Sequence, residues 1–183
     1  MKVEETHLKD CYVIEPQVFE DHRGYFFESF NADKFQEKTG LTINFVQDNE
    51  SKSSKGVLRG LHFQIGDHEQ SKLVRVVKGA VIDFCVDLRK ESPTFCQTFS
   101  VELNEENRKQ LFVPKGFAHG FVVLKDNTII NYKCDNFYHK DSERGIIFND
   151  KDLNIDWRLP EDEIILSEKD NKLPTLSEYL NEN

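Results

Sequence analysis

The stretch GVLRGLHFQ at residues 56–64 places a cation and an imidazole, Arg59 and His62, in a run whose other residues are typical of a β-strand. A histidine titrates near neutrality, so it can remove or return a proton at physiological pH. An arginine offers a planar charged fork that matches two oxygens of a phosphate or carboxylate. The pair suits proton transfer on a bound anion, although an isolated Arg or His in a strand more often faces water.

Strand geometry sets a condition on this pair. Successive side chains point to opposite faces of a strand, so Arg59 and His62, three residues apart, belong to opposite faces. Both can serve one site only if the strand is irregular between them or begins at Arg59. Gly60 allows the first solution, because glycine within a strand often marks a β-bulge.

Short β-rich runs separated by turn signals fill most of the chain. Strands are expected at 11–18, 24–30, 43–48, 56–64, 71–78, 80–88, 95–102, 110–114, 118–124, 128–135 and 144–148. The segments 31–40, with Asn31 as N-cap and Gly40 as C-cap, and 174–180 look helical. This pattern predicts an all-β jelly roll with short peripheral helices, whose barrel mouth can hold a ligand.

One expected strand, VIDFCVDL at 81–88, has two different faces. Ile82, Phe84, Val86 and Leu88 share one face, while Asp83 and Asp87 lie on the other with Val81 and Cys85. A half-polar face suits a barrel interior that holds something polar.

Size and composition set further bounds. The 183 residues suffice for one domain, expected over 1–183 with a short helical tail from about residue 174. No run approaches the ~20 apolar residues of a membrane span, and the charged N-terminus lacks a signal-peptide core. The four cysteines form no Cys-x-x-Cys pair, which disfavours a zinc ribbon or disulfide scaffold. We therefore expect a cytoplasmic protein that does not contact membranes.

Charge is unevenly distributed. The net charge of −9 disfavours nucleic-acid binding. Residues 51–78 nevertheless hold six basic and two acidic side chains, a local charge of +4. One basic segment in an acidic protein suits a small anion held in a pocket, and a solvated charged surface is the alternative.

The segment PKGFAHGF at 114–121 resembles the second motif of the cupin superfamily, jelly rolls whose barrel often holds a metal. The first cupin motif normally supplies His-x-His, but here the corresponding residues are His62, Phe63 and Gln64. Glutamine is a poor ligand for the transition metals of such sites. We therefore expect no metal. The chain also lacks the G-x-S-x-G, phosphate-loop, dinucleotide-turn and H-E-x-x-H motifs.

Seven blocks in order resemble the dTDP-4-dehydrorhamnose 3,5-epimerase family: DHRGYFFESF, QDNESKSSKGVLRGLHFQ, SKLVRVVKGAVIDFCVDLRKESPTF, LFVPKGFAHGF, NYKCDNFY, ERGIIFNDKDLNIDW and ILSEKD. The resemblance spans about residues 1–175. It implies a cupin-like double-stranded jelly-roll barrel that needs no cofactor and inverts C3 and C5 of dTDP-4-dehydro-6-deoxy-D-glucose. The product, dTDP-4-dehydro-L-rhamnose, belongs to dTDP-L-rhamnose biosynthesis. Ser71 and Cys96 depart from the expected Ala and Gly, which concerns packing.

The resemblance implies catalytic roles that fit the chemistry of a 4-keto sugar. The protons at C3 and C5 are acidic because both carbons flank the carbonyl, so inversion needs a base, an enolate stabiliser and an acid on the opposite face. His62 would be the base and Asp170 the carboxylate that fixes its tautomer. Lys72 would stabilise the enolate oxygen and Tyr132 would return the proton. Asp83 is a second candidate for orienting His62.

The same resemblance implies substrate contacts. Arg59, Arg23 and His119 would hold the phosphates, and Tyr138 would stack on the base. The other expected contact residues are Phe26, Glu28, Gln47, Asp48, Asn49, Lys72, Glu143 and Glu168. In related enzymes an exchanged N-terminal strand carries the Arg23 region to the partner, so we expect a homodimer with strand exchange, which the sequence does not distinguish from self-pairing.

Three alternatives remain open at this level. One is an epimerase that inverts only C3 or C5 of a related dTDP-4-keto-6-deoxy sugar. Another is a catalytically silent binder of sugar nucleotides, which would require none of the four catalytic side chains. The third, a metal-dependent cupin oxygenase, is disfavoured by the incomplete His-x-His pair.

Overall fold

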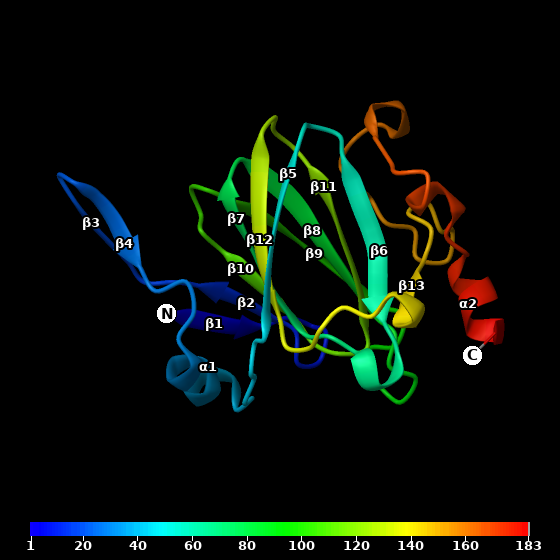
Figure 1. Ribbon diagram of the computed structural model, residues 1–183, viewed down its shortest axis with the longest axis horizontal. Helices are drawn as coiled ribbons and strands as arrows, with labels where there is room; N and C mark the ends of the chain where they lie inside the picture. The colour runs from blue at the N-terminus through cyan, green and yellow to red at the C-terminus, as the bar shows by residue number, and fades with distance from the viewer. Residues whose placement is uncertain (183) are drawn as a thin grey trace.

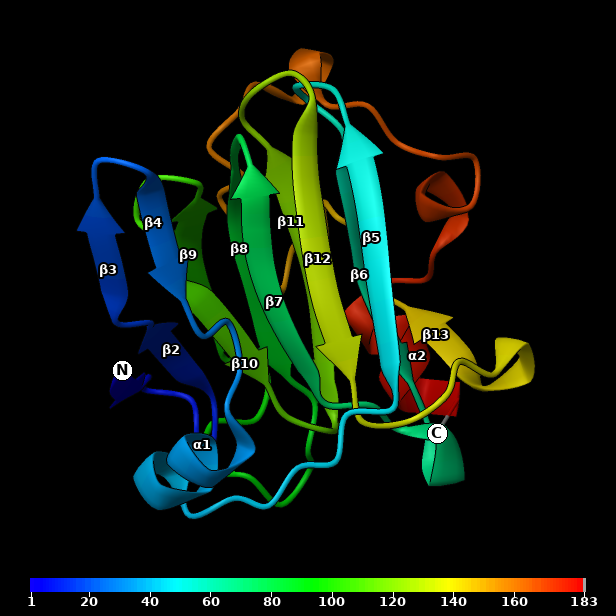
Figure 2. The same ribbon diagram turned by 60° about the vertical axis from the view of Figure 1, so that its left-hand side comes forward.

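The computed structural model describes residues 1–182, in which two antiparallel β-sheets lie face to face (Figures 1 and 2). The first has the order β1 (Lys2–Glu5), β2 (Tyr12–Glu15), β10 (Gln110–Val113), β7 (Lys72–Lys78), β12 (Thr128–Cys134) and β5 (Gln47–Ser53). The second has the order β13 (Glu143–Gly145), β6 (Leu58–Gln64), β11 (Phe117–Val123), β8 (Ala80–Asp87) and β9 (Thr98–Asn104). The all-β class expected from the sequence is confirmed, as an open sandwich with free edges on both sheets.

The remaining elements lie outside these sheets. They are the hairpin of β3 (Val18–Asp21) and β4 (Gly24–Phe27), the helices α1 (Ala32–Thr39) and α2 (Leu176–Glu182), and the 3₁₀ turns η1 (Gly66–His68), η2 (Lys140–Ser142), η3 (Glu161–Glu163) and η4 (Asp170–Lys172). Both expected helices are confirmed. Asn31 caps α1 by accepting from the Lys34 N–H, and Gly40 ends it in the left-handed region. No helix within residues 1–182 is long and apolar enough to cross a membrane.

Three apolar clusters hold these layers together. The first fills the space between the sheets, where Val74 and Ile130 of one sheet pack with Val81 and Phe121 of the other. The second covers the outer face of the five-stranded sheet with the chain that follows β13 (Figure 1). In the third, Phe35 of α1 packs on the six-stranded sheet. β8 contributes to two of these clusters, because its side chains alternate between the sheet faces. Val81 and Cys85 pack between the sheets, and Phe84 and Val86 pack in the outer layer.

The second cluster fixes the course of the C-terminal segment. Phe84 and Val86, on the outward face of β8, pack with Phe148, Trp157 and Leu176. The Trp157 indole donates to the Phe148 carbonyl at 2.7 Å, so its polar edge is satisfied inside the apolar layer. The inward face of β8 carries the buried Asp83, as the half-polar alternation predicted.

Several strand bounds differ from the expected ones. β5 occupies Gln47–Ser53 rather than 43–48, although QDNESKS contains no large apolar residue. It forms because all seven of its residues pair with β12 and because its inward face lines a polar cavity instead of core. β1 was not expected at all, since KVEE is a short charged edge strand.

The structure shows the local environment of Ser71 and Cys96, the two residues that depart from the expected Ala and Gly. Ser71 is buried, and its N–H donates to the Asp135 carboxylate at 2.6 Å. Cys96 has a φ of 60°, in the left-handed region that glycine adopts without strain. A non-glycine residue there carries a backbone cost, so this departure does concern local packing.

The bulge that Gly60 was expected to allow is present. His62 of β6 faces His119 of β11, and Arg59 faces Phe121, so three steps along β6 match two along β11. Gly60 has a φ of 128°, and a Cβ there would lie 2.5 Å from the Gly120 Cα. Only glycine fits this close approach, and the extra residue turns Arg59 and His62 toward one cavity.

Gly60→Ala should therefore destabilise the fold by at least about 2 kcal/mol, since the added methyl must displace the β11 backbone. Gly24→Ala is the matched control, because Gly24 has a φ of 126° but no atom within 4 Å of the added Cβ. It should cost about 1 kcal/mol from backbone strain alone. Urea unfolding of the three proteins measures both effects, and equal losses would contradict the close-packing argument.

Candidate active site

The best-formed cavity lies between the two sheets and has a volume of about 430 Å³. The side chains around it include Arg59, His62, Lys72, His119, Tyr132 and Asp170. An adjoining cavity of about 320 Å³ shares His62, Lys72 and Tyr132 with the first, and continues toward Gln47, Asn49, Tyr138 and Glu143. The two cavities thus meet at the residues that the sequence singled out for catalysis.

His62 is held by a carboxylate that comes from far along the chain. The Nε2 atom of His62 lies 2.5 Å from Oδ1 of Asp170, 108 residues later. The second Asp170 oxygen accepts from the Ser167 hydroxyl at 3.0 Å. The segment reaches this place because Ile165 forms a parallel bridge with Val57, just before β6. The arrangement fixes which ring nitrogen of His62 faces away from Asp170.

The pKa of Asp170 reflects two opposing effects. Burial by itself would raise the pKa of this carboxyl. The hydrogen bond and charge of His62, together with the Ser167 hydroxyl, outweigh burial and hold the pKa below its ordinary value. Asp170 is therefore ionised at neutral pH, which makes the other His62 nitrogen a better proton acceptor.

Asp83 contacts the other histidine of the cavity. Its Oδ1 lies 2.6 Å from Nε2 of His119, and both side chains are buried. β11 lies between β6 and β8 in the sheet, so a side chain on β8 reaches His119 rather than His62. The alternative in which Asp83 orients His62 is therefore wrong.

Lys72 and Tyr132 enter the cavity from the opposite sheet. Lys72 is on β7 and Tyr132 on the neighbouring β12, where Tyr132 pairs with Val74. Burial lowers the pKa of the Lys72 ammonium, and the nearby carboxylates of Asp83 and Glu143 oppose this shift. Burial raises the pKa of the Tyr132 phenol. Tyr132 thus stays protonated at neutral pH and can act as an acid on the side of the cavity opposite His62.

The larger cavity is also lined by two further cations, Arg59 and Lys169. Arg59 donates to the Ser53 hydroxyl at 3.4 Å. Lys169, which the sequence analysis did not select, lines the cavity and pairs with Glu143 at 2.5 Å. Glu143 also accepts from the Tyr138 hydroxyl at 2.9 Å. These contacts link the C-terminal segment to the loop that carries Tyr138.

Two other residues near the site, Ser51 and Ser167, were not selected from the sequence, although local pattern could have identified them. Ser51 lies on the same face of β5 as Gln47 and Asn49, and it lines the larger cavity with its buried hydroxyl unpaired. Ser167 lies three residues before Asp170 in the segment ILSEKD, so its proximity to that carboxylate follows from a turn.

Five expected contact residues do not reach either cavity within one chain. Asp48 lies on the outer face of β5, where it pairs with Lys133. Glu168 is exposed. Glu28 binds Asn31 and Lys34 beside α1, while Arg23 and Phe26 lie on the β3–β4 hairpin. Asp48 points away from the cavities because side chains alternate between the faces of β5. Arg23 and Phe26 lie on the hairpin and Glu28 directly follows it, and this part of the chain projects from the sheets (Figure 1).

Gln64 does not present its amide as a metal ligand. Its Nε2 donates to the carbonyls of His68 and Phe137, and its Oε1 accepts from the His139 N–H. Within residues 1–182, no three His, Cys, Asp or Glu side chains come together as a metal-binding set.

Comparison with known proteins gives a consistent picture. The sequence profile of the family described as dTDP-4-dehydrorhamnose 3,5-epimerase matches residues 5–178. The enzyme of that name from Shigella flexneri is 52% identical over 170 residues, 93% of each chain. The one from Escherichia coli (strain K12) is 49% identical over 180 residues, 98% of this chain and 97% of its own.

Solved structures agree with this match. The chain superposes on the crystal structure of dTDP-4-dehydrorhamnose 3,5-epimerase from Elizabethkingia anophelis NUHP1 with a TM-score of 0.94 and 58% identity, covering 97% of both chains. It also superposes on a Legionella pneumophila dTDP-6-deoxy-D-glucose-3,5-epimerase in complex with dTDP-4-keto-L-rhamnose, with a TM-score of 0.92, 46% identity and coverage of 96% and 93%.

The Asp170 carboxylate should also stabilise the fold in a pH-dependent way. Its pKa is depressed in the folded protein, so its contribution is present above the unfolded pKa and is lost as the pH falls through the folded one. Asp170→Asn should lower the free energy of unfolding by about 2 kcal/mol near neutral pH. The two proteins should converge in acid.

Urea titrations at a series of pH values measure this difference. The same substitution in a His62→Gln background is the control, because the imidazole that depresses the pKa is then missing. A difference between wild type and Asp170→Asn that stays constant from pH 7 to acid would refute the assignment.

Proposed function

The chain belongs to the dTDP-4-dehydrorhamnose 3,5-epimerase family, and we infer that it inverts C3 and C5 of dTDP-4-dehydro-6-deoxy-D-glucose to give dTDP-4-dehydro-L-rhamnose. One observation supports this best. His62 projects from the five-stranded sheet and Tyr132 from the six-stranded sheet into the same cavity. A sugar ring held between the sheets therefore meets a base on one face and an acid on the other.

The proposed reaction begins with proton removal. The free nitrogen of His62 takes the proton from the carbon next to the keto group, and Asp170 stabilises the resulting imidazolium. The electron pair moves to the keto oxygen, giving an enolate. Lys72 stabilises that oxygen with its ammonium group, whose partly desolvated surroundings strengthen the interaction.

Inversion is completed from the opposite side. Tyr132 donates its phenolic proton to the same carbon, which breaks the enolate and restores the ketone with inverted configuration. His62 then holds the substrate proton and Tyr132 lacks one, so both return to their starting states by exchange with solvent. No carbon changes its oxidation state, which explains why the reaction needs no redox cofactor.

The nucleotide part of the substrate should lie along the rim. Arg59 and His119 suit the diphosphate, and the second cavity, with Tyr138, Gln47 and Asn49, suits the nucleoside. A Bacillus anthracis relative has been solved with TDP and PPi bound, which supports a nucleotide site in this fold. The four cysteines are free thiols, which fits our proposal that the enzyme works in the reducing cytoplasm.

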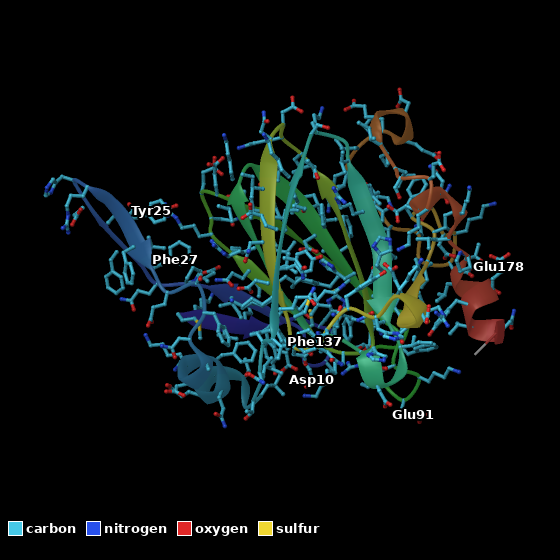
Figure 3. The ribbon with its side chains drawn as sticks, viewed as in Figure 1. Asp10, Tyr25, Phe27, Glu91, Phe137 and Glu178 are labelled. Atoms are coloured by element: carbon cyan, nitrogen blue, oxygen red, sulfur yellow. The ribbon has the colours of Figure 1, made fainter. Side chains whose placement is uncertain are left out.

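The β3–β4 hairpin supports a homodimer in which this arm is exchanged. It projects beyond the edges of both sheets in Figure 1, and Figure 3 labels Tyr25 and Phe27 on it. Phe19, Tyr25 and Phe26 are 55%, 58% and 65% exposed, which is unusual for large aromatic side chains. We propose that a second copy covers them and that Arg23 binds the diphosphate in the partner's site.

A second candidate comes from a more distant relative. The 3′-monoepimerase from Streptomyces bikiniensis is 31% identical and has a TM-score of 0.88, so the same fold can act on one carbon. The experiment that tests the proposed 3,5-epimerase activity also shows whether one or two carbons of the sugar exchange their protons. Conversion of dTDP-4-dehydro-6-deoxy-D-glucose in D₂O, followed by NMR, should show deuterium at both C3 and C5.

The base and the acid should be separable in this assay. His62→Asn should lower exchange at both carbons by about 10²–10⁴-fold, because no enolate forms. Tyr132→Phe should retain exchange with the original configuration while net inversion falls by a similar factor. Full epimerisation by folded His62→Asn would overturn the assignment of the base. Loss of exchange in Tyr132→Phe would instead make Tyr132 part of enolate stabilisation.

The exchanged arm can be tested by complementation. Arg23→Ala and His62→Asn should each be nearly inactive as homodimers. In a purified heterodimer, exchange places the intact Arg23 of one chain beside the intact His62 of the other, so about half of the wild-type rate should return. A heterodimer as inactive as its parents would show that Arg23 serves its own chain, and an active Arg23→Ala homodimer would show that Arg23 serves no site.

A further inference from the structure

Gln64 ends β6 at the boundary of the second cavity, and all of its hydrogen bonds go to main-chain groups of two loops. The side chain is buried. Its Nε2 lies 3.0 Å from the His68 carbonyl oxygen and 3.3 Å from that of Phe137, while its Oε1 lies 2.7 Å from the His139 nitrogen. An amide offers two N–H donors, and both are used here.

The first of these loops contains η1 and the second joins β12 to η2. Side-chain amides supply the contacts of the second loop. Gln70 donates to the Asn136 carbonyl at 2.8 Å, Asn136 donates to the Asp67 carbonyl at 2.8 Å, and Gln47 accepts from the Tyr138 N–H at 3.3 Å. Asn136 also joins the two loops, since its Oδ1 accepts from the Phe137 N–H at 2.9 Å, but it belongs to the second loop itself. Gln64 joins both loops from β6, outside either of them.

The two loops also meet through their imidazoles. The rings of His68 and His139 stack at 4.0 Å between centroids, with 5° between their planes. Gln64 binds the main chain of both residues, so it sets the distance between the stacked rings. Between Phe137 and His139 lies Tyr138, whose hydroxyl reaches Glu143 in the cavity wall.

We propose that Gln64 is a positioning residue for nucleoside binding: by bridging His68, Phe137 and His139 it holds the Tyr138–Glu143 wall in the geometry that receives the base and ribose. The proposal rests on the function inferred above. Gln64 does not contact the reacting carbons, since its amide is occupied by the loops. Its loss should therefore act on binding and leave proton transfer in place.

Two substitutions separate positioning from simple packing. Gln64→Met keeps the length and removes all three hydrogen bonds. Gln64→Glu keeps the shape and the acceptor but directs a carboxylate at the His68 and Phe137 carbonyl oxygens, which repel it. A packing role predicts that Gln64→Glu binds nucleotide almost normally, whereas a positioning role predicts that it binds more weakly than Gln64→Met.

Calorimetry with dTDP measures the effect on binding. Gln64→Met should raise the Kd for dTDP about tenfold, and Gln64→Glu should raise it further, since each lost hydrogen bond is worth a several-fold change in affinity. KM for the sugar nucleotide should rise in parallel. For Gln64→Met, the kcat at saturation should stay within about threefold of wild type, because this variant adds no charge and leaves His62, Lys72 and Tyr132 untouched.

Thr128→Val is the matched control. Thr128 is also buried and its hydroxyl also binds main-chain groups, the Lys125 carbonyl at 2.7 Å and the Ala80 N–H at 3.3 Å, but it lines neither cavity. This variant should lose stability without changing the Kd for dTDP.

Binding of thymidine shows whether Gln64→Glu weakens dTDP through loss of loop positioning or through charge repulsion of the phosphates. The introduced carboxylate could weaken dTDP simply by repelling its phosphates, and thymidine carries none. A positioning effect must therefore weaken thymidine as well, which competition against dTDP measures.

The outcomes are distinct. Three results would each overturn the proposal: normal dTDP binding by Gln64→Glu, a fall in the kcat of Gln64→Met with unchanged KM, or weakened binding of dTDP by Gln64→Glu with unchanged binding of thymidine. If the wild-type protein bound dTDP but showed no epimerisation, the function inferred above would fail, while the Kd series would still test the role of Gln64.

Discussion

The contact between His62 and Asp170 joins two distant parts of the chain, and the packing of the C-terminal segment maintains it. The histidine is fixed by a strand in the middle of the chain, and the carboxylate arrives 108 residues later on a segment with little regular structure. That segment is held by an apolar layer over the five-stranded sheet. The Asp150 carboxylate adds a bond to the Leu176 N–H at 2.7 Å, which fixes the start of α2. Hydrophobic burial on the outside of the sheet thus determines which ring nitrogen of His62 contacts a carboxylate on its inside.

The cavity also contains a partly desolvated cation, Lys72, near the carboxylates of Asp83 and Glu143. Desolvation disfavours the charged form of each group. Lys72 loses hydration in the cavity, and its pKa falls because of that burial. Asp83 and Glu143 lie close enough to favour the charged ammonium, yet both are bound to other partners, His119 and Lys169. In the proposed reaction, the Lys72 ammonium is therefore available for the enolate oxygen. A direct ion pair with either carboxylate would have consumed it.

Much of this arrangement follows from sequence pattern, and the exceptions have physical causes. The alternation in β8 predicted a half-polar inward face. Gly60 in β6 allowed, without requiring, the bulge that brings Arg59 and His62 together. Local pattern did not predict β5, because its polar residues line a cavity and pair with β12 instead of packing in a core. The partner of Asp83 depends on strand order, since β11 separates it from His62. Strand order is a non-local property that periodicity does not report.

Neutral amides have a physical advantage as the supports of the nucleoside wall. Charged side chains at Gln64, Gln70 or Asn136 would act on His62 and Lys72 across a cavity of low dielectric, where Coulomb interactions are strong. Amides hold the loops through dipoles that do not titrate, so the loop geometry stays constant while His62 and Tyr132 gain and lose protons. At Gln64, where the cupin motif would place a metal-ligating histidine, a neutral amide binds the backbone of two loops. In the proposed mechanism, this choice leaves the charge in the cavity to the groups that move protons.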